Sequence, residues 1–389
     1  MFFVDEPYVS DFFKRTVLEN QLPVVNTPAA QKFTFPAGTR LISEAEAIQT
    51  ARETPDLRIY TTSENTIGWI AANLGFTGIP AQIELFKNKA KFRRMIQPLY
   101  PHFAFREVKV NELRSLRFEE LPAPFVLKPA VGFFSLGVHM VRSPREWEAA
   151  LGSVEAELDT LRGMYPEEVL NIDSFLIEQC IEGDEFAVDA YFNGSGEIVV
   201  LDILHHSFAS AADVSDRIYT TSKEIIESNL DEFSAFLGKI GALAGVRNFP
   251  VHVELRRTAA GELIPIEVNP MRFGGWCSTP DLAYLAYGLN PYLYYARQQK
   301  PDWEQLLHGK ENKLFSVIVL DNSTGKSADE IRAFDYAACL ARFAKPLELR
   351  KIDYHRHPLF AFLFVETRTD HQEELRSILQ SRLNEFISC

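Results

Sequence analysis

Residues 264–277 read IPIEVNPMRFGGWC, and this stretch decides the fold. It opens as an apolar, strand-forming run, but Glu267 and Asn269 interrupt the run. A second apolar run lies just upstream, FPVHVELRR, and it contains Glu254. Polar and acidic residues are depleted in strands, so two carboxylates and an amide in neighbouring strand-like segments indicate a site rather than a plain sheet.

The two runs flank the turn sequence TAAGEL and are expected to form a β-hairpin. A four-residue loop over 259–262 places Glu254 opposite Glu267 and His252 opposite Asn269. All four side chains then share one face, because side chains alternate along a strand. Opposed Cβ atoms lie about 5 Å apart. Two carboxylates at that separation repel by about 3 kcal/mol at an effective dielectric constant near 20.

A hard divalent cation would offset this repulsion. Mg²⁺ takes one or two carboxylates together with water and substrate phosphates, and Asn269 adds a neutral oxygen. We therefore expect Glu254, Glu267 and Asn269 to be metal ligands. An exposed hairpin face with solvated acids is an open alternative, as is an ion pair of Glu254 with Arg256 or Arg257. The hypothesis depends on register, since a one-residue slip would put the two acids on opposite faces.

Length and composition exclude several classes of protein. The 389 residues predict two or three domains, and 46% apolar with 24% charged residues is typical of globular proteins. A net charge of −13 argues against a nucleic-acid or anionic-membrane surface. No apolar run is long enough for a membrane span, and the first residues lack the basic region of a signal peptide. Four scattered cysteines without a CxxC motif favour reduced thiols in a cytoplasmic protein.

The pattern of elements changes along the chain. Residues 1–85 alternate strand-like and helical stretches, which predicts a small α/β unit. Residues 86–100 read as one basic helix that stops at Pro101. Residues 120–205 read as strand, glycine loop, strand, a helix from Pro144, and then three strands joined by EGD and NGSG turns.

Lys128 ends the apolar strand FVLKPA and is followed by a loop with three small residues, Gly132, Ser135 and Gly137. A lysine there either reaches out to water or faces an anion. Glycines let backbone N–H groups approach phosphate oxygens closely. A plain hairpin turn explains the same residues equally well.

A second phosphate-loop candidate is weaker. The stretch VIVLDNSTGKSADEI resembles half of a P-loop, but Leu320 stands where the motif requires glycine. Ser327 followed by Glu330 instead predicts a capping box at a helix start.

The order of Lys89, Lys128, the glycine loop, IEQCIEGDEF and the Glu254/Glu267/Asn269 set resembles the ATP-grasp superfamily, especially its carboxylate–amine ligases. The resemblance covers residues 85–280, and the Glu-x-Asn-Pro…Gly-Gly ending is its most specific part. It implies a mixed α+β and α/β ATP-grasp fold, divided into an N-terminal α/β domain (1–88), a linker helix with the lid (89–185), a catalytic core (186–309) and a C-terminal α+β extension (310–389).

The resemblance also implies roles for individual residues. Lys89 and Lys128 would bind the α- and β-phosphates, and the loop with Gly132, Ser135 and Gly137 would close over them.

The nucleoside would lie beside the EQCI segment. Glu178 would contact the adenine amino group, and the backbone from Gln179 to Ile181 would bind the adenine edge. Glu185 would take the ribose hydroxyls.

The acceptor end of the site would involve two arginines. Arg272 resembles the arginine that binds the acceptor carboxylate or acyl phosphate. In the family pattern this arginine directly follows Asn-Pro, whereas here Met271 lies between them. Arg217 would reach the γ-phosphate or acyl phosphate, and a solvated loop arginine is an equal alternative.

The implied activity is an ATP- and Mg²⁺-dependent ligase, with Mn²⁺ as a substitute, that activates a small carboxylate as an acyl phosphate and joins it to an amine. Alternatives are a thiol or carbon acceptor, and a nucleotide-binding protein without turnover. The expected partners are small molecules, with neither nucleic acid nor membrane. A homo-oligomer is left open, since the aromatic-rich stretch 280–297 suits an interface as well as a core.

Overall fold

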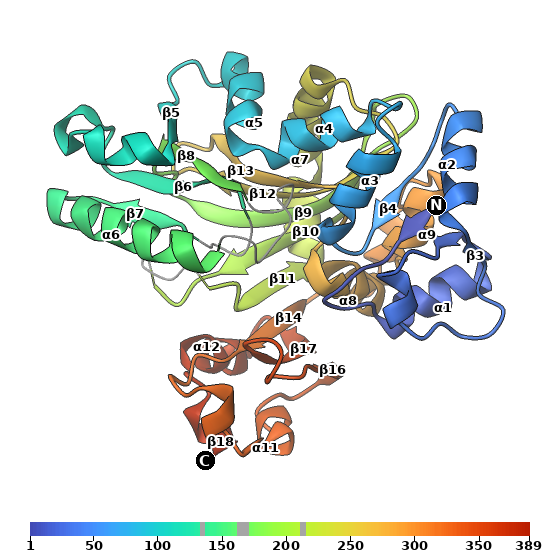
Figure 1. Ribbon diagram of the computed structural model, residues 1–389. Coiled ribbons are helices and arrows are strands. Elements are labelled where there is room, and N and C mark those ends of the chain that lie inside the picture. The colour runs from blue at the N-terminus through green and yellow to red at the C-terminus, as the bar shows by residue number, and fades with distance from the viewer. Residues whose placement is uncertain (133–136, 162–170, 211–214) are drawn as a thin grey trace.

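The computed structural model describes all residues of the chain except 133–136, 162–170 and 211–214. A long antiparallel sheet occupies the middle of the molecule, with the N-terminal unit and the lid at its two sides and the C-terminal unit at one end (Figure 1). In the described part of the chain, no helix is both long and apolar enough to cross a bilayer.

The N-terminal unit is a small parallel sheet covered by helices, as the alternating pattern predicts. The strand order is β3-β2-β1-β4. Serine caps begin two of the helices: Ser10 accepts a hydrogen bond from Phe13 N and Ser43 accepts one from Glu46 N. The elements are β1 (Phe2–Phe3), α1 (Asp11–Glu19), β2 (Val24–Val25), β3 (Leu41–Ile42), α2 (Glu44–Glu53), β4 (Tyr60–Thr61) and α3 (Ile67–Asn73).

Two helices, rather than one, link this unit to the lid. The sequence predicts a single basic helix over 86–100, but α4 (Ile79–Lys87) ends at Asn88 and α5 (Lys89–Ile96) begins there. Asn88 has an extended backbone, and its side chain accepts a hydrogen bond from Lys91 N at 3.0 Å. The prediction was wrong because an asparagine inside a helical pattern also serves as an N-cap.

The lid is a four-stranded antiparallel sheet with one long helix on its apolar face. The strand order is β5-β8-β6-β7, and Phe125, Leu127 and Ile177 of the sheet form one core with Trp147 of the helix. The elements are β5 (Phe105–Lys109), β6 (Phe125–Val131), β7 (His139–Val141), α6 (Pro144–Leu161) and β8 (Asn171–Gln179).

The EGD sequence is not a hairpin turn, contrary to the prediction. It connects β8 of the lid to β9 (Asp184–Phe192) of the central sheet. Gly183 has a φ of +139°, and a Cβ there would lie 2.0 Å from the carbonyl oxygen of Arg257, so this crossing needs glycine. A local turn signal cannot show which sheet the next strand joins.

The central sheet has eight strands in the order β13-β12-β9-β10-β11-β14-β17-β16. The helix α7 (Lys223–Ala244) packs on it, begins at the cap Ser222 and ends at left-handed Gly245. The aromatic-rich stretch forms core, since Tyr287, Tyr292 and Tyr295 are buried. The further elements are β10 (Ile198–Ser207), β11 (Ile218–Ser222), β12 (Phe249–Arg257), β13 (Leu263–Pro270), α8 (Ser278–Tyr287) and α9 (Pro291–Arg297).

Most of the C-terminal strands continue the central sheet, while two short ones pair in a separate two-stranded sheet. β14 pairs with β11, and β17 pairs with both β14 and β16. Ser327 and Glu330 form the predicted capping box. The elements are α10 (Trp303–Leu306), β14 (Lys313–Asp321), β15 (Ala333–Phe334), α11 (Tyr336–Leu340), β16 (Pro346–Lys351), β17 (Leu359–Arg368), α12 (Glu373–Gln380) and β18 (Ile387–Ser388).

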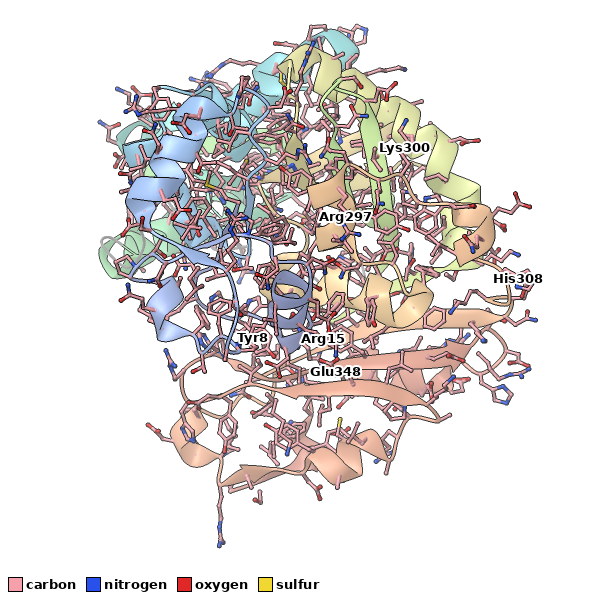
Figure 2. The ribbon with its side chains drawn as sticks, turned by 90° about the vertical axis from the view of Figure 1, so that its right-hand side faces the viewer. Tyr8, Arg15, Arg297, Lys300, His308 and Glu348 are labelled. Atoms are coloured by element: carbon pink, nitrogen blue, oxygen red, sulfur yellow. The ribbon has the colours of Figure 1, made fainter. Side chains whose placement is uncertain are left out.

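A buried ion pair joins the C-terminal unit to the core. Arg350 of β16 donates to Asp281 of α8 at 2.6 Å and to the carbonyl of Trp276 at 3.0 Å. Its guanidinium lies 4.9 Å from the ring of Tyr8 in the N-terminal unit. Glu348 of the same strand also accepts from Arg350, at 3.2 Å, and Figure 2 labels both Tyr8 and Glu348 in this part of the molecule. Burial raises the pKa of Asp281 to about 6, so its charge depends on the arginine.

A second buried cluster fixes the lid to the core. Glu178 of β8 accepts from Arg93 of α5 at 2.6 Å and from Lys128 of β6 at 2.5 Å. Arg93 also donates to the carbonyl of Pro265 on β13 at 2.6 Å. Burial alone would raise the pKa of Glu178, but the two cations lower it to about 2.

We predict that Arg350→Met lowers the free energy of unfolding by about 3–5 kcal/mol, because it leaves the buried carboxylate of Asp281 without its cation. Chemical denaturation at pH 7 followed by tryptophan fluorescence measures the change. Arg368→Met on β17 is the control: its ion pair with Asp370 is exposed, so we expect a much smaller change in stability. Equal effects of the two substitutions would contradict the structural role of Arg350.

We predict that Glu178→Gln also destabilises the fold, and that the difference in free energy of unfolding between the variant and the wild type depends on pH. A carboxyl group whose pKa drops from 4.5 to about 2 on folding contributes stability above pH 4.5. That contribution is lost as the pH falls from 4.5 towards 2, so the two stabilities should converge on acidification. Denaturation curves at a series of pH values measure the gap. Glu155→Gln, in an exposed pair with Arg114, should show a much weaker trend, because water screens that pair.

Candidate active site

The predicted hairpin register is confirmed. Glu254 lies opposite Glu267, and His252 lies opposite Asn269. The register shifts by one residue after Glu254, towards the turn, where the prediction of uniform pairing fails because of a β-bulge. The bulge lies beyond the two acids, so they still share one face.

That face of the central sheet has polar residues in three rows that cross several strands. One row joins Glu267, Glu254 and Ala187, and the small alanine leaves space beside the acids. The row towards Asn269 continues through His252 to Asp189. On the other side, Arg256, Glu185, His206 and Tyr219 form the third row.

The two opposed acids differ in their ionisation. Burial and the facing Glu267 raise the pKa of Glu254 well above its usual value. Burial acts on Glu267 in the same sense, but the Lys89 ammonium 2.7 Å away lowers its pKa. The side chains of Glu254 and Glu267 stay 26% and 18% exposed, so a ligand can reach both.

Lys89 and Lys87 contact the start of the glycine loop as well as acids. Lys89 Nζ donates to the carbonyl of Gly132 at 3.1 Å and Lys87 Nζ does so at 3.4 Å. Burial works against the charge of Lys89, but Glu267 raises its pKa. Lys87 and Lys89 therefore do not form the solvated helix face that is usual for such a sequence. Lys91 of the same segment does lie on a solvated face, since it pairs with Glu84 at the surface.

Glu64 is a functional candidate that the sequence analysis missed. It follows β4, and its carboxylate pairs with Lys87 on one oxygen and with Arg272 on the other. Arg272 Nε and one terminal nitrogen lie 3.0 and 2.8 Å from Oε1 of Glu64. The sequence did hold a signal for Glu64: it lies just after a predicted strand of the N-terminal unit, and ligands bind at the carboxyl ends of strands in parallel sheets.

The additional residue Met271 turns the chain towards Glu64. It has a left-handed backbone with φ of +67°, and its side chain is buried. Its carbonyl accepts a hydrogen bond of 2.8 Å from Thr61 N in β4. Left-handed conformation is costly for a residue with a side chain, and Trp276 and Cys277 share it. Such backbone persists where surrounding contacts enforce it, commonly at functional sites.

Asp189 holds the floor of this region together. It is fully buried and accepts from His252 Nδ1 at 2.7 Å and from Gly274 N at 3.0 Å. Thr279 Oγ1 donates to its second oxygen. A Cβ at Gly274 would lie 2.0 Å from Thr279 Oγ1, so the turn after Arg272 requires glycine.

In this structure, the residues that we expect to bind the nucleoside make hydrogen bonds and ion pairs with other protein groups. The carboxylate of Glu178 accepts from Arg93 and Lys128, so the expected contact with the adenine amino group would compete with these two pairs. Gln179 N donates to Ala104 O at 3.0 Å, and the carbonyl of Ile181 accepts from Arg256.

Glu185 likewise has protein partners on both carboxylate oxygens. His206 Nδ1 lies 2.8 Å from Oε1, and Arg256 Nε donates to Oε2 at 2.9 Å. Contacts of Glu185 with a ribose would compete with these two pairs.

Arg217 does not reach the cluster, contrary to the catalytic role expected for it. It lies just before β11 and is buried against the C-terminal unit. Its guanidinium contacts Asp321 at 2.7 Å and Ser323 Oγ at 2.8 Å. The sequence could not show this, because the partners follow more than 100 residues later.

Of the other glycine-loop residues, Gly137 has a φ of +68°, and Ser135 lies outside the described residues.

The donor set fits a divalent cation only in part before a ligand binds. Among the described residues, no group of three or more histidine, cysteine or acidic side chains is arranged to hold a metal ion. A hard cation would stabilise the groups that are present here. They are two opposed carboxylates, one of which has a raised pKa, and the buried amide of Asn269. In the present arrangement, Lys89 neutralises one of the two acids.

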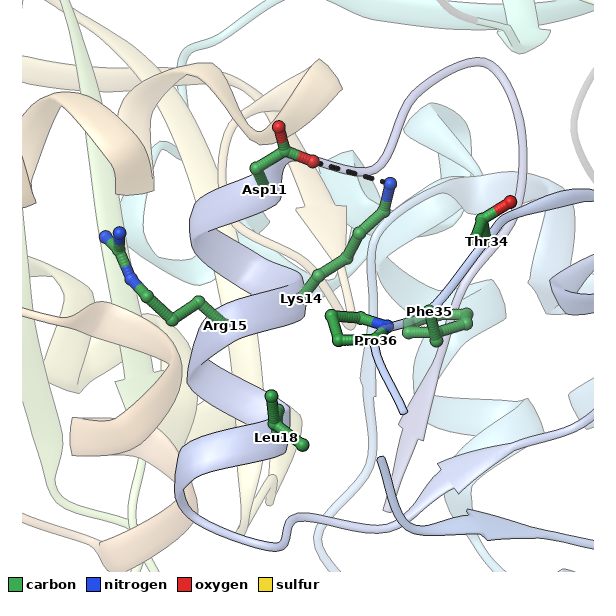
Figure 3. A pocket seen from close by; sticks show the side chains of 7 residues that line it. All are labelled: Asp11, Lys14, Arg15, Leu18, Thr34, Phe35 and Pro36. Atoms are coloured by element: carbon green, nitrogen blue, oxygen red, sulfur yellow. Dashed lines mark ion pairs between the residues drawn. The ribbon is translucent and has the colours of Figure 1, made fainter. Parts of the chain in front are cut away.

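A surface hollow lies apart from this cluster. It lies between α1 and residues 34–36, and Figure 3 shows Lys14 reaching towards Asp11 at its edge. The two charges are 3.5 Å apart and Asp11 is exposed. None of the cluster residues lines this hollow.

Comparison with known proteins agrees with this geometry. Residues 121–280 match the family model of the ATP-grasp domain. No curated protein matches the sequence significantly.

Three solved structures illustrate the similarity of fold. An L-amino acid ligase from Bacillus licheniformis has a TM-score of 0.72 at 18% identity, with 100% of this chain and 97% of that chain covered. Biotin carboxylase from Campylobacter jejuni has a TM-score of 0.62 at 13% identity, covering 94% and 87%. N5-carboxyaminoimidazole synthase from Aspergillus clavatus has a TM-score of 0.61 at 12% identity, covering 99% and 98%. Residues 121–280 therefore match an ATP-grasp domain, and the chain as a whole shares the fold of these solved structures.

Proposed function

We propose that the protein is an ATP-dependent ligase that activates a small carboxylate as an acyl phosphate and joins it to an amine. The observation that supports this most is the continuous set of contacts from Glu254 and Glu267 through Lys89 to Gly132, the first residue of the glycine loop. These groups offer cations for phosphates and paired acids for a cation in one place.

The comparisons support the same class of reaction. The structure with the highest quoted TM-score is titled an L-amino acid ligase, and the Campylobacter and Aspergillus structures are titled as complexes with ATP and ADP ligands respectively. At these identities the likeness concerns the fold, so the amide-forming reaction rests on the site residues.

In the proposed reaction, a carboxylate oxygen of the substrate attacks the γ-phosphorus of ATP and ADP leaves. Lys89 and Lys128 stabilise charge on the phosphates, and Arg272 binds the carboxylate as it becomes an acyl phosphate. Phosphoryl transfer of this kind needs positioning and charge stabilisation more than a nucleophilic side chain. Burial of Lys128 and Lys89 strengthens both contributions, because interactions between charges are stronger where water is excluded.

The amine nitrogen then attacks the acyl carbon. The tetrahedral adduct expels inorganic phosphate, and the nitrogen loses a proton to form the neutral amide. The lid sheet would cover the site during this step, since exclusion of water protects the acyl phosphate from hydrolysis. Glu254, Glu267 and Asn269 would hold Mg²⁺, which when bound neutralises the acids and the phosphate oxygens.

The test of this proposal is a panel of small carboxylates and amines, including pooled amino acids, incubated with ATP and Mg²⁺. We expect ADP and phosphate in equal amounts with the amide, and only when acid and amine are both present. Thiol acceptors form a second arm of the panel. ADP formation that requires a thiol, or stabilisation of the fold by ATP without any turnover, would contradict amide formation.

We predict that Glu267→Gln reduces turnover by at least about 10²-fold, since the amide cannot neutralise Lys89 or a cation, while the protein still folds. Steady-state ADP release and thermal melting measure the two quantities. Glu262→Gln is a matched control, because Glu262 lies exposed in the turn of the same hairpin. Wild-type turnover in Glu267→Gln would remove Glu267 from the site.

A further inference from the structure

Glu64 is a buried carboxylate of the N-terminal unit that contacts cations from two other parts of the chain. One oxygen pairs with Lys87 at the end of α4, and the other accepts two hydrogen bonds from Arg272, which follows β13. We propose that Glu64 is a positioning residue that fixes the Arg272 guanidinium at the acceptor end of the site. The inference deepens the proposed function and rests on it for the role of Arg272.

The carboxylate of Glu64 is itself held in place. Its side chain is only 7% exposed and that of Lys87 only 5%, so neither charge can turn towards water. Lys87 also donates to the carbonyl of Gly132. Glu64 therefore cannot rotate without breaking its ion pair with buried Lys87, which makes it a fixed partner for Arg272.

The contacts of Arg272 define which of its donors remain for a substrate. A guanidinium has five N–H groups. Nε and one terminal nitrogen each use one on Glu64, and the other terminal nitrogen uses one on the carbonyl of Phe273 at 2.8 Å. One N–H on each terminal nitrogen is left, and two such donors suit the oxygens of a carboxylate or phosphate.

A competing interpretation uses the same contacts. Glu64 could act as a stand-in for the substrate carboxylate that must leave Arg272 before binding. The burial of Glu64 and its pair with Lys87 favour the fixed arrangement. The two interpretations predict opposite effects on the substrate KM, so one experiment separates them.

The experiment compares Glu64→Gln with Glu84→Gln. Glu84 is the control because it also pairs with a lysine, Lys91, but at the surface. In Glu64→Gln we expect kcat to fall about 10²-fold through misplacement of Arg272, with a higher KM for the carboxylate and an unchanged KM for ATP. We also expect more phosphate than amide, because the acyl phosphate is lost to water. An unchanged kcat, or a lower KM for the carboxylate, would overturn the proposal.

Two further variants keep the test decisive. Glu64→Gln combined with Lys87→Met removes both buried charges, so it replaces the single variant if that one fails to fold, with the same expected result. In an Arg272→Ala background, Glu64→Gln should cause little further loss, because Glu64 acts through Arg272. Additive losses would instead show a role independent of Arg272.

A chemical measurement tests the inference without turnover. Phenylglyoxal modifies arginine side chains, and peptide mass spectrometry gives the rate at Arg272. We expect a faster rate in Glu64→Gln than in the wild type or Glu84→Gln, and equal rates would overturn the inference. If the wild type forms no amide but the rates differ, the proposed function fails and the positioning role stands. If the wild type forms amide but the modification rates are equal, the positioning role fails and the proposed function stands.

Discussion

The facing carboxylates of Glu254 and Glu267 are the constraint on which the rest of the site depends. A β-hairpin holds their Cβ atoms at a distance where two negative charges repel by about 3 kcal/mol. The structure meets that cost in two ways: Lys89 neutralises Glu267, and the raised pKa of Glu254 favours its neutral form. The hairpin therefore keeps a high affinity for positive charge even where a lysine already supplies part of it.

The same principle explains how the units of the chain are joined. Buried cations pair with acids from different elements: Arg272 with Glu64, Arg93 with Glu178, and Arg350 with Asp281. A buried ion pair is costly to break because the remaining charge has no water. These pairs thus fix the N-terminal unit, the lid and the C-terminal unit relative to the central sheet.

The sequence predicted what depends on local pattern. The hairpin register, the capping box at Ser327 and the ATP-grasp fold follow from strand alternation, turn residues and motif order. Contacts between distant segments could not be predicted in this way. Arg217 pairs with Asp321, and β8 and β9 join different sheets despite a turn-like EGD sequence. Neither outcome is encoded within one window of residues, because sheet membership and ion-pair partners are set by tertiary packing.

Charge balance gives a reason for an arrangement in which Lys89 contacts Glu267. If nucleotide alone entered, its phosphates would draw Lys89 away and would face two carboxylates with no compensating charge. If a cation and a triphosphate entered together, the cation would replace Lys89 at Glu267 while Lys89 moved to the phosphates, so every buried charge would keep a partner. In the proposed function, the lysine and the two acids would thus favour the complex of nucleotide and divalent ion over either component, without a preformed three-acid metal site.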